Sequence, residues 1–254
     1  MRCALWVLVL AVAAGAQGRG GGTPRSNAPI DLTGYWVSQI VDEWRFRVSP
    51  QKGDILYLPL NAEARRVANG WDPAADEAEN RACRAYGAVG VMQRPGRLHV
   101  TWENDETLRI DADAGTQTRL LHFGAAAAGH GAAAWRGYST AQWQFSGRAQ
   151  LDLGGVGFAP GGGPDARSAR NGTLKAITTN MLPGYLRKNG VPYSASAVLT
   201  EYFNRLGGAE GDAYLLVTAT LEDPTYLTQP FVRTYAFKKQ PNASGWDPTP
   251  CWTR

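Results

Sequence analysis

Apolar and polar residues alternate through residues 97–123, in three short runs separated by two turn-like segments. A period of two residues is typical of a β-strand with one buried face. The pattern therefore predicts three antiparallel strands, with turns at residues 104–106 and 114–115. The apolar face of the first two strands carries Leu98, Val100, Trp102, Leu108, Ile110 and Ala112.

These turns also predict which polar residues lie opposite each other. His99 is expected opposite Asp111, Asp111 opposite Thr118, and Thr107 opposite His122. A carboxylate beside an imidazole fixes its tautomer and stabilises its cation, as a general base requires. The same row is equally compatible with a wetted outer sheet face, where cross-strand pairs add little stability. The alternation alone leaves both readings open.

The remaining pattern is dominated by strand signals. Helix signals are confined to two segments: Asn61 opens a stretch of helix formers ending at Asn69, and Asp72 with Pro73 opens a second ending at Gly87. The sequence therefore predicts a mainly β protein, an antiparallel β-barrel with one or two short helices. A two-sheet β-sandwich is the alternative. Further strands are expected over residues 32–41, 43–49, 54–60, 138–153, 174–180, 197–206, 213–222 and 231–239.

The first 16 residues have the organisation of an export signal. Arg2 supplies the positive charge, and residues 14–16 form an Ala-x-Ala cleavage site after an apolar run shorter than the roughly 20 residues that span a bilayer. We therefore expect a signal peptide at residues 1–16, a flexible leader at 17–29 and a single β-barrel domain at 30–254. The protein is expected to be exported and periplasmic or extracellular.

Two cysteines, Cys83 and Cys251, remain after such a cleavage. In an oxidising compartment an even pair most simply forms a disulfide, although a catalytic thiol is the alternative for either residue. A disulfide closing so long a loop stabilises a fold by about 4–5 kcal/mol in the chain-entropy model.

The charge pattern excludes several function classes. Lys and Arg number 26 against 22 Asp and Glu, and the cations are scattered rather than clustered, so no nucleic-acid footprint is expected. No polybasic segment or amphipathic helix predicts stable membrane insertion. The Gly-rich stretches lack phosphate-loop spacing, and no His-x-x-x-His or Cys-x-x-Cys occurs, so neither a cofactor nor a metal site is predicted.

The segment 31–38, DLTGYWVS, resembles the Gly-x-Trp signature that opens the first strand of lipocalin-like barrels. That resemblance implies that Trp36 plugs one barrel end beneath an arginine from the last strand, where Arg233 stands. More broadly, the segments 31–38, 83–123, 182–195 and 222–231 are similar to a group of secreted bacterial proteins of unknown function. This second resemblance implies no activity.

The leading expectation is an exported protein that binds a small, largely apolar or aromatic molecule inside the barrel. No oligomeric state is predicted. The expected wall, plug and polar residues of the ligand site are Trp36, Trp102, His122, Tyr202, Arg233 and Tyr235.

Two alternatives remain. The first is a cofactor-independent isomerase, lyase or hydrolase in the barrel lumen, with His99 as general base, Asp111 as its orienter and an arginine as anion stabiliser. The second is an envelope interaction protein whose barrel is filled by side chains. A cavity without paired ionisable groups favours a binding protein, and one lined by His99 and Asp111 favours an enzyme.

Two further segments carry cations whose direction the pattern leaves open. In residues 44–48, Arg45 and Arg47 alternate with aromatic residues, so they form either an inward anion-reading pair or a solvated strand edge. In residues 182–193, Arg187 and Lys188 belong to a Pro/Gly-rich loop that either covers a barrel mouth as a lid or simply caps strands.

Overall fold

The computed structural model describes residues 21–48, 50–128, 131–145, 172–208 and 211–253. The expected signal peptide and the first residues of the expected leader lie outside the described residues. The later leader packs against the barrel, because Trp143 Nε1 donates a hydrogen bond to Pro24 O at 2.8 Å and Arg25 N donates to Asp105 O at 3.1 Å.

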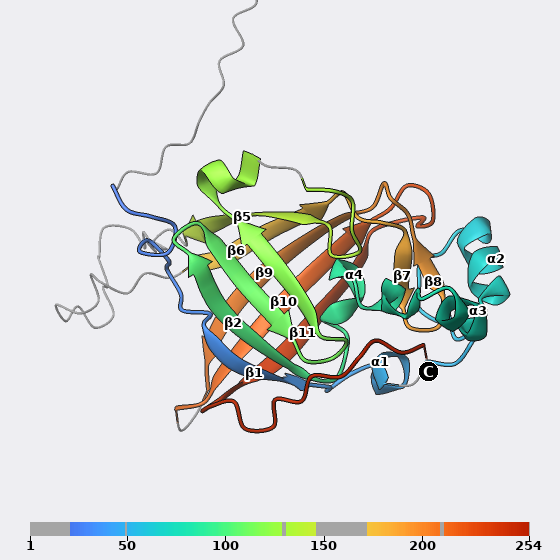
Figure 1. Cartoon of the computed structure of the whole chain (residues 1–254), viewed down its shortest axis with the longest axis horizontal. Helices are drawn as coiled ribbons and strands as arrows, with labels where there is room; N and C mark the ends of the chain where they lie inside the picture. Colours follow the sequence, from blue (N-terminus) through green and yellow to red (C-terminus); the bar gives the residue numbers. More distant parts are fainter. Residues whose placement is uncertain (1–20, 49, 129–130, 146–171, 209–210, 254) are drawn as a thin grey trace, which may run out of the picture.

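Nine of the described strands form a closed barrel in the order β1-β11-β10-β9-β6-β5-β4-β3-β2 (Figure 1). The strands are β1 (Gly34–Gln39), β2 (Arg97–Asn104), β3 (Thr107–Ala112), β4 (Gln117–His122), β5 (Tyr138–Phe145), β6 (Gly172–Thr179), β9 (Val198–Gly207), β10 (Ala213–Glu222) and β11 (Phe231–Gln240). Neighbouring strands are antiparallel except β4 and β5, which are parallel. The predicted barrel class is confirmed.

A group of short elements lies at one end of the barrel, on the right in Figure 1. We call residues 44–48, 50–95 and 184–193 the cap. It contains α1 (Trp44–Val48), α2 (Ala62–Gly70), α3 (Pro73–Ala78), the 3₁₀ helix η1 (Ala82–Ala85), α4 (Ala88–Val91) and the hairpin of β7 (Gly184–Arg187) and β8 (Val191–Tyr193). A further 3₁₀ helix, η2 (Gly124–Ala128), lies outside the cap. The segment for which a lid and a strand-capping loop were the alternatives is thus a hairpin, buried at every position of its two strands.

The barrel interior is mainly apolar and is filled by inward-facing side chains of every strand. The largest fully buried ones include Trp36, Leu108, Leu121, Leu174, Phe203, Leu215 and Phe237. One ion pair lies among them: Arg119 on β4 donates to both carboxylate oxygens of Glu201 on β9, at 3.0 and 2.5 Å. Arg119 also donates to Thr178, whose hydroxyl bonds Ser139. Each charge compensates the other, since burying either one alone is costly, although Arg119 Nε has no hydrogen-bond partner among the described residues.

Most of the predicted register at residues 97–123 is confirmed. His99 pairs with Asp111, Asp111 with Thr118, and Thr107 with His122. The first helix runs over Ala62–Gly70, with the Asn61 side chain accepting from Ala64 N at 2.9 Å.

Three predicted elements differ from the structure. Residues 43–49 were expected as a strand, but residues 44–48 form α1, because one helical turn packs the adjacent Phe46 and Arg47 into the cap. Residues 54–60 form a loop with a single bridge between Leu60 and Leu227 instead of a strand. The second helix ends at Ala78, since Asn80 takes a positive φ of 54° that an α-helix does not accommodate.

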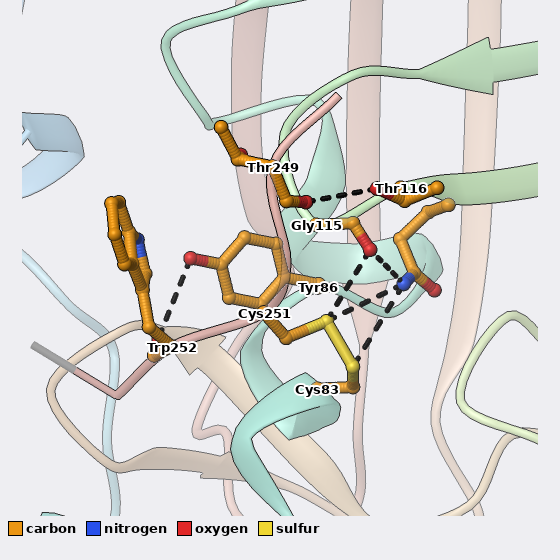
Figure 2. The surroundings of a disulfide bond; sticks show 8 residues. Cys83, Tyr86, Gly115, Thr116, Thr249, Cys251 and Trp252 are labelled. Atoms are coloured by element: carbon orange, nitrogen blue, oxygen red, sulfur yellow. Dashed lines mark hydrogen bonds between the residues drawn. A yellow bond between two sulfur atoms is a disulfide. The ribbon is translucent and has the colours of Figure 1, made fainter. Parts of the chain in front are cut away.

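Cys83 and Cys251 are joined by the predicted disulfide. The bond links η1 of the cap to the C-terminal segment, which crosses the barrel end beside the turn between β3 and β4 (Figure 2). Within the described residues, no helix has the length and apolarity needed to cross a membrane.

Reduction of the Cys83–Cys251 disulfide is expected to lower the melting temperature by about 10 °C, because it releases a loop whose ends are 168 residues apart in sequence. Thermal unfolding followed by circular dichroism with and without reductant measures this shift. The matched control is the double variant Cys83→Ser/Cys251→Ser, which should already have the lower value and should not respond to reductant. An unchanged melting temperature in the reduced wild-type protein would contradict this account.

Candidate functional site

Four of the residues predicted for a site lie on the outer face of the barrel. Their strand neighbours Leu98, Leu121 and Phe203 fill the interior, so the outward residues point the other way. The outward residues are His99, Asp111, His122 and Tyr202. Of the two readings left open for His99 and Asp111, the outer sheet face is therefore the correct one, and His122 and Tyr202 do not lie in the lumen where a ligand site was expected.

His99 and Asp111 face each other across β2 and β3 but bond to other partners. The His99 ring stacks on Tyr35 with centroids 4.0 Å apart. Asp111 accepts from Arg109 Nε at 2.8 Å and from Thr118 Oγ1 at 2.5 Å. Although burial opposes it, these bonds hold the pKa of Asp111 below its usual value. His99 and Asp111 therefore do not form a general acid–base pair in the barrel lumen.

The other two outward residues make local contacts. His122 stacks on Tyr138 with centroids 4.7 Å apart, and burial lowers the pKa of its imidazole. Tyr202 lies under the Lys175 ammonium, which is 5.7 Å from the ring centroid. Neither contact opens onto the barrel interior.

The remaining predicted residues face inward. Trp36 is fully buried and donates Nε1 to Leu32 O at 2.9 Å. Trp102 packs against Phe123 and Trp143 at ring distances of 5.6 and 6.5 Å. Tyr235 is buried at the cap end, where burial raises the pKa of its phenol.

Arg233 is not the cation over Trp36. Lys239 takes that place, with Nζ 4.6 Å from the ring, because the β1–β11 register sets Trp36 opposite Lys239. Arg233 lies six residues earlier, at the cap end, and donates to both oxygens of Glu43 at 2.9 and 2.8 Å. It therefore anchors the start of α1 to the last strand.

A pocket of about 340 Å³ lies where the cap, the β3–β4 turn and the C-terminal segment meet. We call it the basic pocket. It is lined by Arg47, Val48, Tyr86, Arg94, Pro95, Ala114, Lys188, Thr249 and Trp252. Three of these residues are cations and none is a carboxylate, so the lining attracts an anion.

Arg94 is the most unusual of the three cations. Its side chain is 5% exposed, its Nε donates to Gly90 O at 3.5 Å, and its Nη2 is buried without a hydrogen-bond partner. No carboxylate of the described residues lies within ion-pair distance of it. Burial and, to a smaller extent, Arg47 lower the pKa of Arg94 to about 10. A buried cation without a counterion is costly, and an anion beside Arg94 would offset that cost.

Arg47 is held from two sides. Its Nε donates to Gln93 O at 3.2 Å and its Nη2 to Ser38 Oγ at 3.4 Å, while its guanidinium lies 5.3 Å from the Tyr235 ring centroid. The nearest carboxylate, Asp42, is 3.7 Å away and half exposed. The inward reading of Arg47 is thus the correct one, whereas Arg45 lies on the surface and pairs with Asp54.

Lys188 reaches the pocket from the turn of the β7–β8 hairpin. Its ammonium lies 5.9 Å from the Tyr86 ring centroid and 5.6 Å from that of Trp252. Burial and the neighbouring Arg94 lower the pKa of Lys188 to about 8. The group therefore titrates close to physiological pH.

The aromatic wall depends on the disulfide and on one glycine (Figure 2). Tyr86 follows the helix that carries Cys83, and its hydroxyl donates to Trp252 O at 3.4 Å, next to Cys251. Gly115, at a φ of 79°, lets the Tyr86 ring pack on the β3–β4 turn; a Cβ there would lie 2.3 Å from Tyr86 Cδ1. The C-terminal segment is pinned by Thr249 N donating to Asp113 O at 2.9 Å.

Sequence reasoning considered Arg47 and Lys188 without placing them, and missed Arg94, Tyr86 and Trp252. These residues come from segments separated by many tens of positions, and only the folded cap brings them together. An isolated arginine in a Pro/Gly-flanked loop, as at residues 94–96, gives no periodic signal.

His99→Ala is expected to lower the melting temperature by no more than about 3 °C, because the ring lies on the outer face and contributes only a stacking contact with Tyr35 and an edge contact with Trp246. Thermal unfolding measures this, with Tyr57→Ala, another exposed aromatic residue, as the surface control. A loss larger than about 10 °C would show that the imidazole is part of the buried network.

The basic pocket can hold a small anion against two aromatic rings. Among the described residues, no group of three or more His, Cys, Asp or Glu is arranged to bind a metal ion. Comparisons of the chain with known protein families, with curated proteins and with solved structures find no match.

Proposed function

We propose that the protein is an exported binding protein whose ligand is a small aromatic or apolar molecule carrying a carboxylate or another oxyanion. The observation that carries this proposal is the buried, unpaired Nη2 of Arg94 in a pocket without a carboxylate. A planar oxyanion accepts two hydrogen bonds from one guanidinium, and such charge-assisted bonds are the strong ones. The volume of about 340 Å³ suits a small ligand.

The aromatic residues of the basic pocket would contact the apolar part of the ligand. Tyr86 and Trp252 flank the Lys188 ammonium, so an anion seated on the cations has an aromatic surface beside its carbon skeleton. Aromatic rings favour flat apolar partners, and the cations fix the orientation of the charged end. The expectation of a small apolar or aromatic partner is kept, with an anionic group added and the site moved from the lumen to the cap.

Export remains part of the proposal. A disulfide between residues far apart is typical of proteins that leave the reducing cytosol. Since this disulfide fastens the segment that carries Trp252, an oxidising compartment favours the complete pocket.

A second candidate is binding of a neutral apolar molecule at the opposite end of the lumen. The supporting observation is the inward cluster of Trp102, Phe123 and Trp143, of which both tryptophans are only partly buried. A ligand at that end would not contact the basic pocket, so the two sites respond to different variants.

Benzoate is expected to bind the wild-type protein, and its uncharged isostere benzamide is not. Arg94→Met should weaken benzoate binding by at least about 30-fold, because one partner of a buried ion pair is removed. Isothermal titration calorimetry measures both affinities. The matched control is Arg136→Met, which removes an exposed arginine outside the pocket and should change nothing.

Arg94→Met should also keep or raise the melting temperature of the ligand-free protein, since it removes a buried charge that has no counterion. This separates loss of binding from loss of fold. Equal binding of benzoate and benzamide, unaffected by Arg94→Met, would overturn the anion proposal and favour the lumenal candidate.

Benzoate affinity is expected to be constant below about pH 7 and to fall as the pH rises above the Lys188 pKa of about 8. Above that pH the ligand-free lysine is neutral, so binding must be accompanied by proton uptake. Arg94, with a pKa of about 10, stays charged over most of this range. Burial raises the pKa of Tyr86, whose phenol stays neutral there.

Titrations between pH 6 and 9.5 measure this dependence, and Lys188→Met should remove it while Arg136→Met keeps it. A dependence of equal size in Lys188→Met would show that another group controls binding.

A further inference from the structure

A second pocket, of about 380 Å³, lies on the other side of the β7–β8 hairpin, between the hairpin and α2, α3 and η1. It shares no lining residue with the basic pocket. The residues that matter for its chemistry are Trp71, Asp76, Arg84, Tyr185, Tyr193 and Tyr226. We call it the tyrosine pocket.

Asp76 organises the tyrosine pocket without being free to bind a ligand. Its Oδ2 accepts from Tyr185 Oη at 2.7 Å and from Trp71 Nε1 at 2.9 Å. Its Oδ1 accepts from Arg81 Nε at 3.2 Å and Arg84 Nη1 at 3.4 Å. Four donors use the acceptor capacity of one carboxylate, so Asp76 is a positioning residue. Although burial opposes it, these bonds hold the pKa of Asp76 below its usual value.

Trp71 is fixed in place by its surroundings. A Cβ on Gly190, which has a φ of 82°, would lie 2.1 Å from Trp71 Cγ, so this glycine is needed for the indole to pack on the hairpin turn. The Tyr185 ring meets the indole edge-on at 6.3 Å. A rigid aromatic ring on the pocket wall costs a ligand little ordering entropy.

The buried hydroxyl of Tyr193 is the polar group of this pocket that lacks a hydrogen-bond partner among the described residues. The Tyr193 side chain is 1% exposed, and its hydroxyl has no hydrogen-bond partner in the part of the chain that the structure describes. The hydroxyl lies at Gly184, whose Cβ would be 2.5 Å from it. Buried polar atoms without partners are rare, and each loses free energy unless something pairs with it. A hydroxyl both donates and accepts, so its missing partner is another group that does both.

The charges of the tyrosine pocket are nearly balanced, unlike those of the basic pocket. Arg66 pairs with Glu63 and Arg81 with Glu79, while Arg84 shares Asp76. The lining therefore selects no ion. It combines aromatic rings with the Tyr193 hydroxyl and the remaining N–H groups of Arg84, which suits a neutral ring that bears several hydroxyls.

We propose that the tyrosine pocket binds a saccharide unit, with the Tyr193 hydroxyl and Arg84 hydrogen-bonding its hydroxyl groups and Trp71 contacting its carbon face. The volume of the pocket suits one or two sugar rings. The proposal is independent of anion binding, because the two pockets have separate linings.

The test uses glucose, N-acetylglucosamine, maltose and chitobiose as probes, with saturation-transfer NMR on the full exported protein. At least one saccharide is expected to receive magnetisation from the protein. Tyr193→Phe should weaken that binding about five-fold, the value of one neutral hydrogen bond. Tyr57→Phe, an exposed tyrosine outside the pocket, is the matched control and should bind like the wild type.

Tyr193→Phe should also keep or raise the melting temperature of the saccharide-free protein, because the lost hydroxyl had no partner. A lowered melting temperature would show that the hydroxyl is already satisfied and would overturn the proposal. Absence of transfer to all four saccharides, or equal transfer in Tyr193→Phe, would overturn it as well. Arg94→Met should leave saccharide binding unchanged, so failure here is distinguishable from failure of the anion proposal.

Discussion

The rest of the structure depends on closure of the barrel by its first strand. β1 pairs with β11 through five residues and with β2 through four, so it covers the two edges that the other eight strands would leave open. Closure of the barrel determines which face of each strand points into the lumen and which face points to solvent. Trp36, at the middle of β1, is fully buried as a result, and the outward His99 stacks on the neighbouring Tyr35. It also creates the barrel end on which the cap sits.

The sequence predicted the barrel because period-two alternation is a local property of each strand. The pattern also predicted that His99 lies opposite Asp111, because a short turn between two strands leaves little choice of register. It failed at residues 44–48, where five alternating residues fit one helical turn as well as a strand. It also failed to tell lumen from solvent at Tyr202. The Arg119–Glu201 pair shows why: its strands meet only in the closed barrel, so a charged residue looks outward in the sequence while it lies inside.

The cap concentrates the chemistry that the barrel wall lacks. Its hairpin contributes to both pockets, Lys188 to the basic pocket and Tyr185 with Tyr193 to the tyrosine pocket. One side presents cations without carboxylates, and the other presents balanced charges with an unpaired hydroxyl. Both are features that folding alone does not favour, because each leaves a buried polar group unsatisfied. Such local costs are typical of surfaces kept for a ligand. In the lumen, Arg119 and Glu201 pair with each other, although Arg119 Nε has no hydrogen-bond partner among the described residues, and most of the other buried side chains are apolar.

Native mass spectrometry of the protein purified from its own host tests the central claim most directly, because it identifies any bound molecule without a choice of probe. The account predicts a bound small molecule that is released as an anion on mild denaturation. The same molecule should be missing from Arg94→Met prepared in the same way and present in Arg136→Met. A neutral apolar molecule that Arg94→Met retains in full would contradict the account and return the ligand to the barrel lumen.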